Sequence, residues 1–192
     1  MKKFNIYLTG VGGQGIGLIS EILLRAADYA GLNVKSVDTH GLAQRGGIVV
    51  SQIRMGRTVY TPLIPAGESD LVVALERHEA LRGIISALKD GGVLIYYNTV
   101  WQPLDVRLEN ADELTEDMIS HECQKCDIKE IKVFEPRLKD IRMQNIAVLA
   151  DIARLKLIPG INHKNYVEAM KDLMESKKLE DNMKLFNSKS GT

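Results

Sequence analysis

Three glycines near the start of the chain are spaced as in turns that bind phosphate. The run Gly10-Val11-Gly12-Gly13-Gln14-Gly15 follows an apolar stretch over residues 4–9 and opens a helical pattern over 16–30. Glycines in a strand, turn and helix of this kind let the backbone turn tightly and approach a ligand. Unpaired N–H groups then lie at the positive end of the helix, which suits a phosphate or pyrophosphate. The run predicts an anion site, and a purely structural turn without a ligand is the alternative.

A second glycine loop follows the next predicted strand. Asp38 stands at the end of an apparent strand over 33–37, where a dinucleotide-binding protein carries its ribose-binding acid. The stretch after it, Thr39-His40-Gly41-Leu42-Ala43-Gln44-Arg45-Gly46-Gly47, has neither helical nor strand periodicity. Ligands of open α/β sheets bind beyond the carboxyl ends of the strands. We therefore expect this loop to open on the same side of the sheet as the first.

Two side chains of the second loop are candidates for ligand contact. His40 is expected either to contact a ligand or a partner's active site, or to order the loop through a hydrogen bond. Arg45 precedes Gly46 and Gly47, so its guanidinium stands beside backbone that a ligand can approach closely. Such a guanidinium is a good clamp for a phosphate or carboxylate. An ion pair with Asp38 is the alternative for Arg45.

The chain lacks the residue patterns of a self-sufficient enzyme. No Gly-x-Ser-x-Gly motif is present, and no Walker lysine follows the glycine run. Cys123 and Cys126 form a lone Cys-x-x-Cys pair, whereas a closed zinc site or an iron–sulfur cluster takes about four ligands. Packing explains the pair, and any cluster must come from another chain. His78 and His163 stand near helix starts and are interpreted as surface or capping residues.

Composition bounds the class of protein. A chain of 192 residues that is 45% hydrophobic suffices for one α/β core. Its 25 basic and 25 acidic side chains cancel, which gives no reason to expect nucleic acid or a membrane surface as partner. Residues 1–60 carry an excess of basic side chains, so we expect an anionic ligand to meet this third. No signal peptide or apolar span is visible, and two cysteines fit a reducing cytoplasm.

The hydrophobic periodicity predicts an α/β fold. We expect a Rossmann-like, mostly parallel sheet with helices on both faces, a short antiparallel edge and C-terminal helices. Residues 1–160 are expected to form the α/β domain, with helices of 161–192 packed on it. The second strand, 33–37, is expected to lie parallel to the first, and 58–60 to pair antiparallel with 48–55. Further strands are expected at 71–75, 93–97 and 131–134, and helices at 76–89, 112–123, 138–157, 165–175 and 179–186.

The two glycine loops together resemble a known family. Most specific are the first 55 residues, and weaker similarities continue through Asn145, Asn182 and Phe186 near the end of the chain. The chain is similar to the gamma-type domain of 2-oxoacid:ferredoxin oxidoreductases, and within that family to the beta subunit of indolepyruvate enzymes. The residues that carry the resemblance, in order, are Gly10-Val11-Gly12-Gly13-Gln14-Gly15, Asp38-Thr39-His40-Gly41, Ala43-Gln44-Arg45-Gly46-Gly47 and Ser51-Gln52-Ile53-Arg54.

The resemblance implies one subunit of a multi-subunit, oxygen-sensitive enzyme. Such an enzyme decarboxylates a 2-oxoacid on thiamine diphosphate, passes electrons through iron–sulfur clusters to ferredoxin and transfers the acyl group to coenzyme A. Thiamine diphosphate and the 4Fe-4S clusters are then held by larger partner subunits, while this chain holds no cofactor alone and contacts coenzyme A in the complex. Homodimer contacts are also expected. The expected contact residues are Gly10, Gly12, Gly13, Gln14, Gly15, Asp38, His40, Gln44, Arg45 and Gly46, with no catalytic residue and no metal ligand.

Two other functions remain open from the residues. A stand-alone NAD(P)-binding Rossmann protein would use the same glycine spacing together with Asp38, although no hydride-transfer partner is recognisable. An assembly subunit without a ligand would use its glycine loops for packing alone.

Overall fold

The fold is built on one six-stranded sheet with the strand order β2-β3-β1-β4-β5-β6. The computed structural model describes residues 3–40, 47–101 and 114–191, without the side chains of His40 and Ser176; Gln44, Arg45 and Gly46 therefore lie outside the described residues. The strands are β1 (Phe4–Val11), β2 (Val34–His40), β3 (Ile48–Met55), β4 (Ser69–Ala74), β5 (Leu88–Tyr97) and β6 (Lys129–Val133).

The sheet is parallel on one side and antiparallel on the other. Strands β1, β4, β5 and β6 pair in parallel, while β3 pairs antiparallel with both β1 and β2. The mostly parallel α/β class was predicted, and β2 runs in the same direction as β1, as predicted for residues 33–37, although the two strands are not neighbours. Strand β3 lies between them, with Leu8 and Asp38 both opposite Ser51. Residues 58–60 form no strand, because β1 and β2 already occupy both edges of β3.

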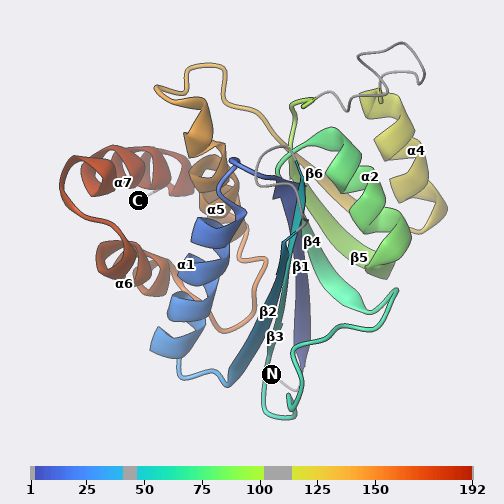
Figure 1. Cartoon of the computed structure of the whole chain (residues 1–192), viewed down its shortest axis with the longest axis horizontal. Helices are drawn as coiled ribbons and strands as arrows, with labels where there is room; N and C mark the ends of the chain where they lie inside the picture. Colours follow the sequence, from blue (N-terminus) through green and yellow to red (C-terminus); the bar gives the residue numbers. More distant parts are fainter. Residues whose placement is uncertain (1–2, 41–46, 102–113, 192) are drawn as a thin grey trace.

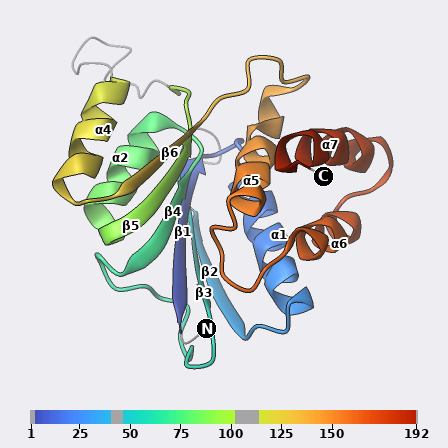
Figure 2. The same ribbon diagram turned by 180° about the vertical axis from the view of Figure 1, so that it is seen from behind.

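Helices cover both faces of the sheet. Figures 1 and 2 show α1, α5, α6 and α7 on one face and α2 with α4 on the other. The helices are α1 (Ile16–Tyr29), α2 (Arg77–Ser86), α4 (Glu116–Lys125), α5 (Gln144–Arg154), α6 (His163–Leu173) and α7 (Ser176–Ser190), and a 3₁₀ turn, η1 (Ile141–Met143), precedes α5.

Several boundaries differ from the sequence prediction. Helix α2 ends at Ser86 rather than near Lys89, because Leu88 already pairs with Ser69 of β4 as the start of β5. The helix predicted over 138–157 is shorter, since η1 occupies its beginning. Helix α7 is longer than predicted and continues to Ser190.

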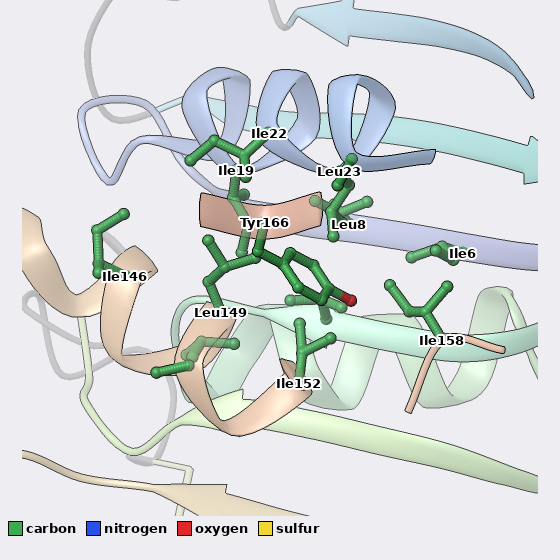
Figure 3. Close-up of a cluster of buried hydrophobic side chains, with 14 of the residues drawn as sticks. Ile6, Leu8, Ile19, Ile22, Leu23, Ile146, Leu149, Ile152, Ile158 and Tyr166 are labelled. Atoms are coloured by element: carbon green, nitrogen blue, oxygen red, sulfur yellow. The ribbon is translucent and has the colours of Figure 1, made fainter. Parts of the chain in front are cut away.

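The larger core lies between the sheet and the four-helix face. Ile6 and Leu8 of β1 pack there against α1 and α5, and Figure 3 shows Tyr166 of α6 inserted among them. Tyr166 is 1% exposed, and its ring lies 6.1 Å from that of Phe186 in α7. A second buried cluster, including Val72 and Ile119, fills the opposite face. Strands β4 and β5 thus contribute side chains to both buried clusters, which explains their near-continuous apolar sequences.

Within the described part of the chain, no helix is both long enough and apolar enough to cross a membrane.

Candidate functional site

The topology creates a switch point at the carboxyl ends of β1 and β4. These strands are parallel neighbours, and the helices that follow them, α1 and α2, cover opposite faces of the sheet. The chain therefore leaves the sheet in two directions at this point, and open α/β sheets bind ligands at such switch points. The glycine turn after β1 and the segment 75–79 after β4 meet here.

The glycine turn leaves backbone N–H groups unpaired. Gly13 and Gly15 have φ angles of 103° and 85°, in the region that favours glycine. Gly15 is the N-cap of α1, which has no side-chain cap and no acidic residue in its first turn. No described residue accepts a hydrogen bond from the amide of Gly13 or Gly15. The positive end of α1 therefore remains available to an anion.

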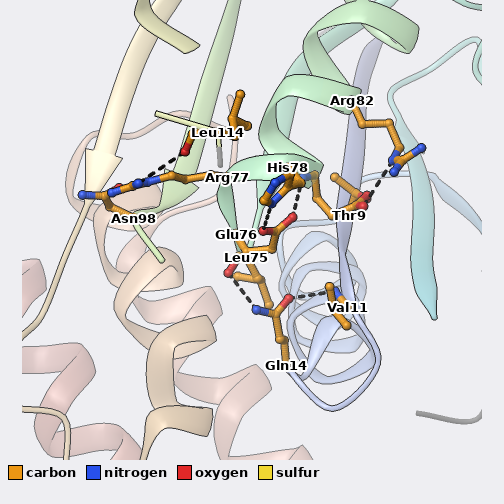
Figure 4. Close-up of polar contacts among 11 residues, drawn as sticks. Thr9, Val11, Gln14, Leu75, Glu76, Arg77, His78, Arg82, Asn98 and Leu114 are labelled. Carbon is orange, nitrogen blue, oxygen red and sulfur yellow. Dashed lines mark hydrogen bonds and ion pairs between the residues drawn. The ribbon is translucent and has the colours of Figure 1, made fainter. Parts of the chain in front are cut away.

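The side chain of Gln14 shapes this turn from the inside. Its Oε1 accepts a 2.7 Å hydrogen bond from the amide of Val11, and its Nε2 donates a 3.0 Å bond to the carbonyl of Leu75 (Figure 4). Gln14 is fully buried, so its side chain braces the turn against the residue after β4. Gln14 was predicted to line the anion site. Its side chain instead points inward and holds the backbone of the turn in place.

Two of the glycines are required by close packing. A Cβ at Gly10 would lie 2.9 Å from both Gln14 Oε1 and Ile16 Cδ1. A Cβ at Gly15 would lie 2.4 Å from Asn145 Nδ2, which donates a 3.2 Å hydrogen bond to the Gly15 carbonyl. At Gly13, by contrast, a Cβ would meet nothing within 4 Å. Gly13 is thus the glycine whose surroundings are open.

A buried polar network that was not predicted from the sequence lies beside the switch point. Thr9 Oγ1 donates a 2.6 Å hydrogen bond to Glu79, whose other oxygen accepts from Arg82 at 3.2 Å. The Glu76 carboxylate caps α2 by accepting from the amide of Glu79 and lies 3.1 Å from His78 Nδ1. Glu76 and Glu79 are 1% and 2% exposed. Glu76, and not His78, caps the N-terminus of α2. The position of an acidic residue directly before the predicted helix could have indicated this cap.

A second polar cluster fixes α4 beside the carboxyl ends of β5 and β6. Arg77 donates to Asn98 at 2.7 Å and pairs with Glu116 at 2.9 Å, and Lys132 also pairs with Glu116. The hydrogen bond from Lys132, followed by the one that Asn98 donates, lowers the pKa of the Glu116 carboxyl. The cluster thus anchors the N-terminus of α4 to the sheet.

A cavity of about 530 Å³ adjoins the outer side of the glycine turn. It lies between α1, the segment around η1 and α7. Lys139 and Asp181 pair across it at 2.7 Å, while Lys178 has no partner among the described residues. The Arg142 guanidinium, paired with Asp140, lowers the pKa of that carboxyl to about 2. The lining residues are Gly13, Gly15, Leu18, Lys139, Asp140, Arg142, Met143, Asn145, Lys178, Asp181 and Asn182.

The structure places the two described ends of the second loop, His40 and Gly47, at the same end of the sheet as the first loop. The amide of Gly12 donates a 2.9 Å hydrogen bond to Gly47, the residue that ends the second loop. The other end of that loop, His40, is in register with Val49 of β3. Gln44, Arg45 and Gly46 connect these ends but lie outside the described residues, so their predicted roles stay predictions.

Asp38 does not occupy the place of a ribose-binding acid. It is exposed on β2, the outermost strand, and β3 separates it from β1. Two strand spacings put it roughly 10 Å from the strand that leads into the glycine turn. In a dinucleotide-binding fold the acid-bearing strand lies directly beside the first strand.

The two cysteines contribute to packing on α4. Cys123 is 2% exposed in the second core, and its burial raises the pKa of the thiol to about 12. Across the described ranges, no group of three or more histidine, cysteine or carboxylate side chains is placed to hold a metal ion.

Fold and site together define an α/β domain that offers a glycine turn to an anion at its switch point, next to a charged cavity. The chain belongs to the pyruvate ferredoxin/flavodoxin oxidoreductase family, whose sequence model matches residues 5–188. Indolepyruvate oxidoreductase subunit IorB of Archaeoglobus fulgidus is 36% identical over 95% of this chain and 91% of its own length. The protein of that name from Methanothermobacter thermautotrophicus is 28% identical over 98% and 97%.

Solved structures share the fold at lower identity. The pyruvate oxidoreductase subunit PORC of Thermotoga maritima has a TM-score of 0.65 at 16% identity and covers 99% of this chain and 96% of its own. The gamma subunit of a keto/oxoacid ferredoxin oxidoreductase from Geobacter sulfurreducens has a TM-score of 0.66 at 21% sequence identity. The match covers 97% of this chain and 96% of that subunit. A 2-oxoglutarate:ferredoxin oxidoreductase of Magnetococcus marinus, with coenzyme A bound, has a TM-score of 0.69 at 19% sequence identity. The match covers 98% of this chain but 30% of that longer chain.

Proposed function

We propose that this chain is the subunit of a 2-oxoacid:ferredoxin oxidoreductase that does not bind thiamine diphosphate and that contributes the coenzyme A side of the site. The whole enzyme oxidatively decarboxylates an aryl or other 2-oxoacid to acyl-CoA and passes the electrons to ferredoxin. Family membership and the relatives named indolepyruvate oxidoreductase subunit support this proposal. The bound coenzyme A in a structure of the same fold is consistent with it.

The glycine turn is the observation that carries the proposal. Its Gly13 and Gly15 amides and the uncapped N-terminus of α1 form an electropositive backbone surface at the switch point. A pyrophosphate such as that of coenzyme A suits this surface. His40, Gln44 and Arg45, on or beside the second loop, are proposed to face the partner subunit or the acyl acceptor.

The remaining cofactors are proposed to lie on partner subunits. Larger subunits would hold thiamine diphosphate and the 4Fe-4S clusters, and ferredoxin would dock on the assembled complex. We further propose homodimer contacts and a cytoplasmic location, where reduced ferredoxin and coenzyme A would both be available.

The alternative of a stand-alone NAD(P)-binding protein finds no support. The glycine spacing is present, but β3 separates Asp38 from the strand that feeds the turn. A ligand-free assembly subunit predicts different behaviour from our proposal: substitution in the glycine turn would weaken subunit association and leave the dependence on coenzyme A unchanged.

Anaerobic co-purification from the native cells tests the proposal. We expect a larger subunit with thiamine diphosphate and iron–sulfur clusters to accompany the chain, and the complex to reduce a viologen dye with a 2-oxoacid and coenzyme A. Aryl pyruvates should be the best substrates. A chain that emerges alone and binds a nicotinamide nucleotide would contradict the proposal.

A further inference from the structure

Strand β2 forms an open edge of the sheet. It is the outermost strand, and in the described sheet it pairs with β3 alone. Among the described residues, no backbone hydrogen bond beyond the β2–β3 ladder involves residues 34–40. In an antiparallel ladder, alternate residues turn their N–H and C=O groups away from the partner strand. The outer edge of β2 therefore presents a row of free donors and acceptors, which is a template for another strand.

The sequence of β2 carries few of the features that protect a sheet edge. Proteins commonly protect such edges with proline, bulges, several charges or a very short strand. Strand β2 has seven residues in continuous register with β3, and it contains no proline. Its lysine and its aspartate, Lys35 and Asp38, carry opposite charges. The strand thus has no net charge that would repel a second copy of itself.

Apolar side chains lie beside this edge on the face of the sheet that carries α2. Val37 is opposite Gln52, whereas the flanking positions of β3, Ser51 and Ile53, are buried on the α1 face. Side chains alternate along a strand, so Val37 and Val50 point to the α2 face. Both are half-buried and belong to neither buried cluster, and α2 packs against β1, β4 and β5. A small apolar surface therefore adjoins the free edge.

The sequence of β2 is complementary to itself. Opposed residues of an antiparallel pair face the same side of the sheet, so a twofold axis between two copies of β2 must pass through a residue. An axis at Val37 places this valine opposite its own copy. It also places Ser36 opposite Asp38, where a hydroxyl can donate to a carboxylate, and Lys35 opposite Thr39. An axis at Asp38 would oppose two carboxylates, and an axis at Ser36 would oppose Lys35 and Val37.

We propose that two copies of this chain associate through β2, paired antiparallel about Val37, so that their sheets become continuous. The proposal rests on the homodimer contacts of the proposed function and assigns them a surface, and it does not depend on coenzyme A. A strand pair alone buries less area than a stable dimer needs. A groove between α1, α6 and the start of β2 adds surface beside the edge. It is lined by both acidic and basic side chains and by apolar ones, namely Glu21, Leu24, Arg25, Asp28, Val34 and Leu173.

Charged variants of Val37 test the proposal on the purified chain in solution. Sedimentation equilibrium should give the wild type a mass twice the 21.4 kDa of one chain. Val37→Glu and Val37→Lys each place like charges at the axis and should raise the dimer dissociation constant at least about tenfold. An equimolar mixture of the two variants should restore dimers, because opposite charges then meet. Val50→Glu is the matched control, since Val50 is half-buried on the same face but on β3, and it should remain dimeric.

Disulfide formation reports the register even where a charged variant fails to fold. Opposed residues of an antiparallel pair have Cα atoms about 4.5–5.5 Å apart, which is within disulfide range. In a Cys126→Ser background, Val37→Cys should therefore form an intermolecular disulfide under mild oxidation. Thr39→Cys is the control on the same face of β2. The register puts it four positions, about 13 Å, from its own copy, so it should stay reduced.

Several results would overturn the proposal: a monomeric wild type, a mixture of the charged variants that stays monomeric, or equal cross-linking at positions 37 and 39. Dissociation by Val50→Glu would also overturn it, because the contact would then use the face of the sheet rather than its edge. Co-purification with a larger subunit and oxidation of a 2-oxoacid keep the proposed function standing in each of these cases. If that activity is missing, the proposed function fails, while the cross-linking still decides the dimer.

Discussion

Gln14 Nε2 donates a 3.0 Å hydrogen bond to the carbonyl oxygen of Leu75, and this contact joins the turn after β1 to the residue after β4. The same amide group accepts from Val11 through its oxygen. One fully buried side chain thereby holds both sides of the switch point. These two hydrogen bonds of Gln14 hold the turn, and with it the free amides of Gly13 and Gly15, in place.

Replacing Gln14 with alanine is expected to destabilise the fold and distort the turn. The substitution leaves the Val11 amide and the Leu75 carbonyl buried without their partner, and each such group costs about 1–3 kcal/mol. We expect the free energy of unfolding, measured by denaturant titration, to fall by at least about 2 kcal/mol. Gln124→Ala, at an exposed position on α4, should change it by less than about 0.5 kcal/mol. Equal effects of the two variants would contradict the bracing role.

Two glycines of one short segment should respond oppositely to alanine. At Gly15 the φ angle is 85° and the new Cβ would lie 2.4 Å from Asn145 Nδ2, so Gly15→Ala should destabilise by about 1–3 kcal/mol. Gly17 lies within α1 with nothing within 4 Å of a Cβ, so Gly17→Ala should stabilise by about 0.4–1 kcal/mol. Thermal unfolding of both variants measures the difference. A destabilising Gly17→Ala would show that the site at the start of α1 is not as open as described.

Thr9 should matter for its hydroxyl rather than its shape. Thr9→Val keeps the branched side chain on β1 but leaves one oxygen of buried Glu79 without a donor. We expect a loss of about 1–3 kcal/mol of unfolding free energy. Thr9→Ser, which retains the donor, should lose less, and the reverse order in denaturant titrations would refute the role of this hydrogen bond.

Cys123 should be unreactive in the native protein and should make stability depend on alkaline pH. Burial raises the pKa of its thiol from 9.0 to about 12. The folded state thus keeps a proton that the unfolded state loses above pH 9, so this contribution is complete below pH 9 and disappears as the pH approaches 12. Unfolding measured from pH 8 to 11 should show a steeper loss for the wild type than for Cys123→Val. Rapid alkylation of native Cys123 at pH 8 would contradict its burial.

Elements whose signals are local were predictable from the sequence. Glycines at 10, 12 and 15 predicted the turn and the helix after it, and the apolar run 71–75 predicted β4. The prediction failed where a strand's position depends on which other strands it pairs with. The apolar pattern of residues 48–55 does not indicate which strands they pair with. The position of β3 between β1 and β2 could therefore not be predicted from it. The strand role of Leu88 likewise depends on pairing with Ser69.

The candidate site was predictable in its backbone and unpredictable in its side chains. Gly13 and Gly15 lie where the glycine spacing placed them, beside the uncapped start of α1. Gln14 faces inward because Leu75, sixty-one positions later, offers it an acceptor. Lys178 lines the same cavity as Gly13 and Gly15 because α7 packs against α5. Such contacts between distant segments leave no periodic signal in either segment.

Hydrogen–deuterium exchange of the assembled complex, with and without coenzyme A, measures whether the glycine turn binds the pyrophosphate. If the glycine turn binds the pyrophosphate, saturating coenzyme A should slow exchange of the amides from Gly13 to Leu18, while amides at the opposite end of the sheet, such as that of Gly67, remain unchanged. Unaltered exchange from Gly13 to Leu18 in a complex that demonstrably uses coenzyme A would contradict the account.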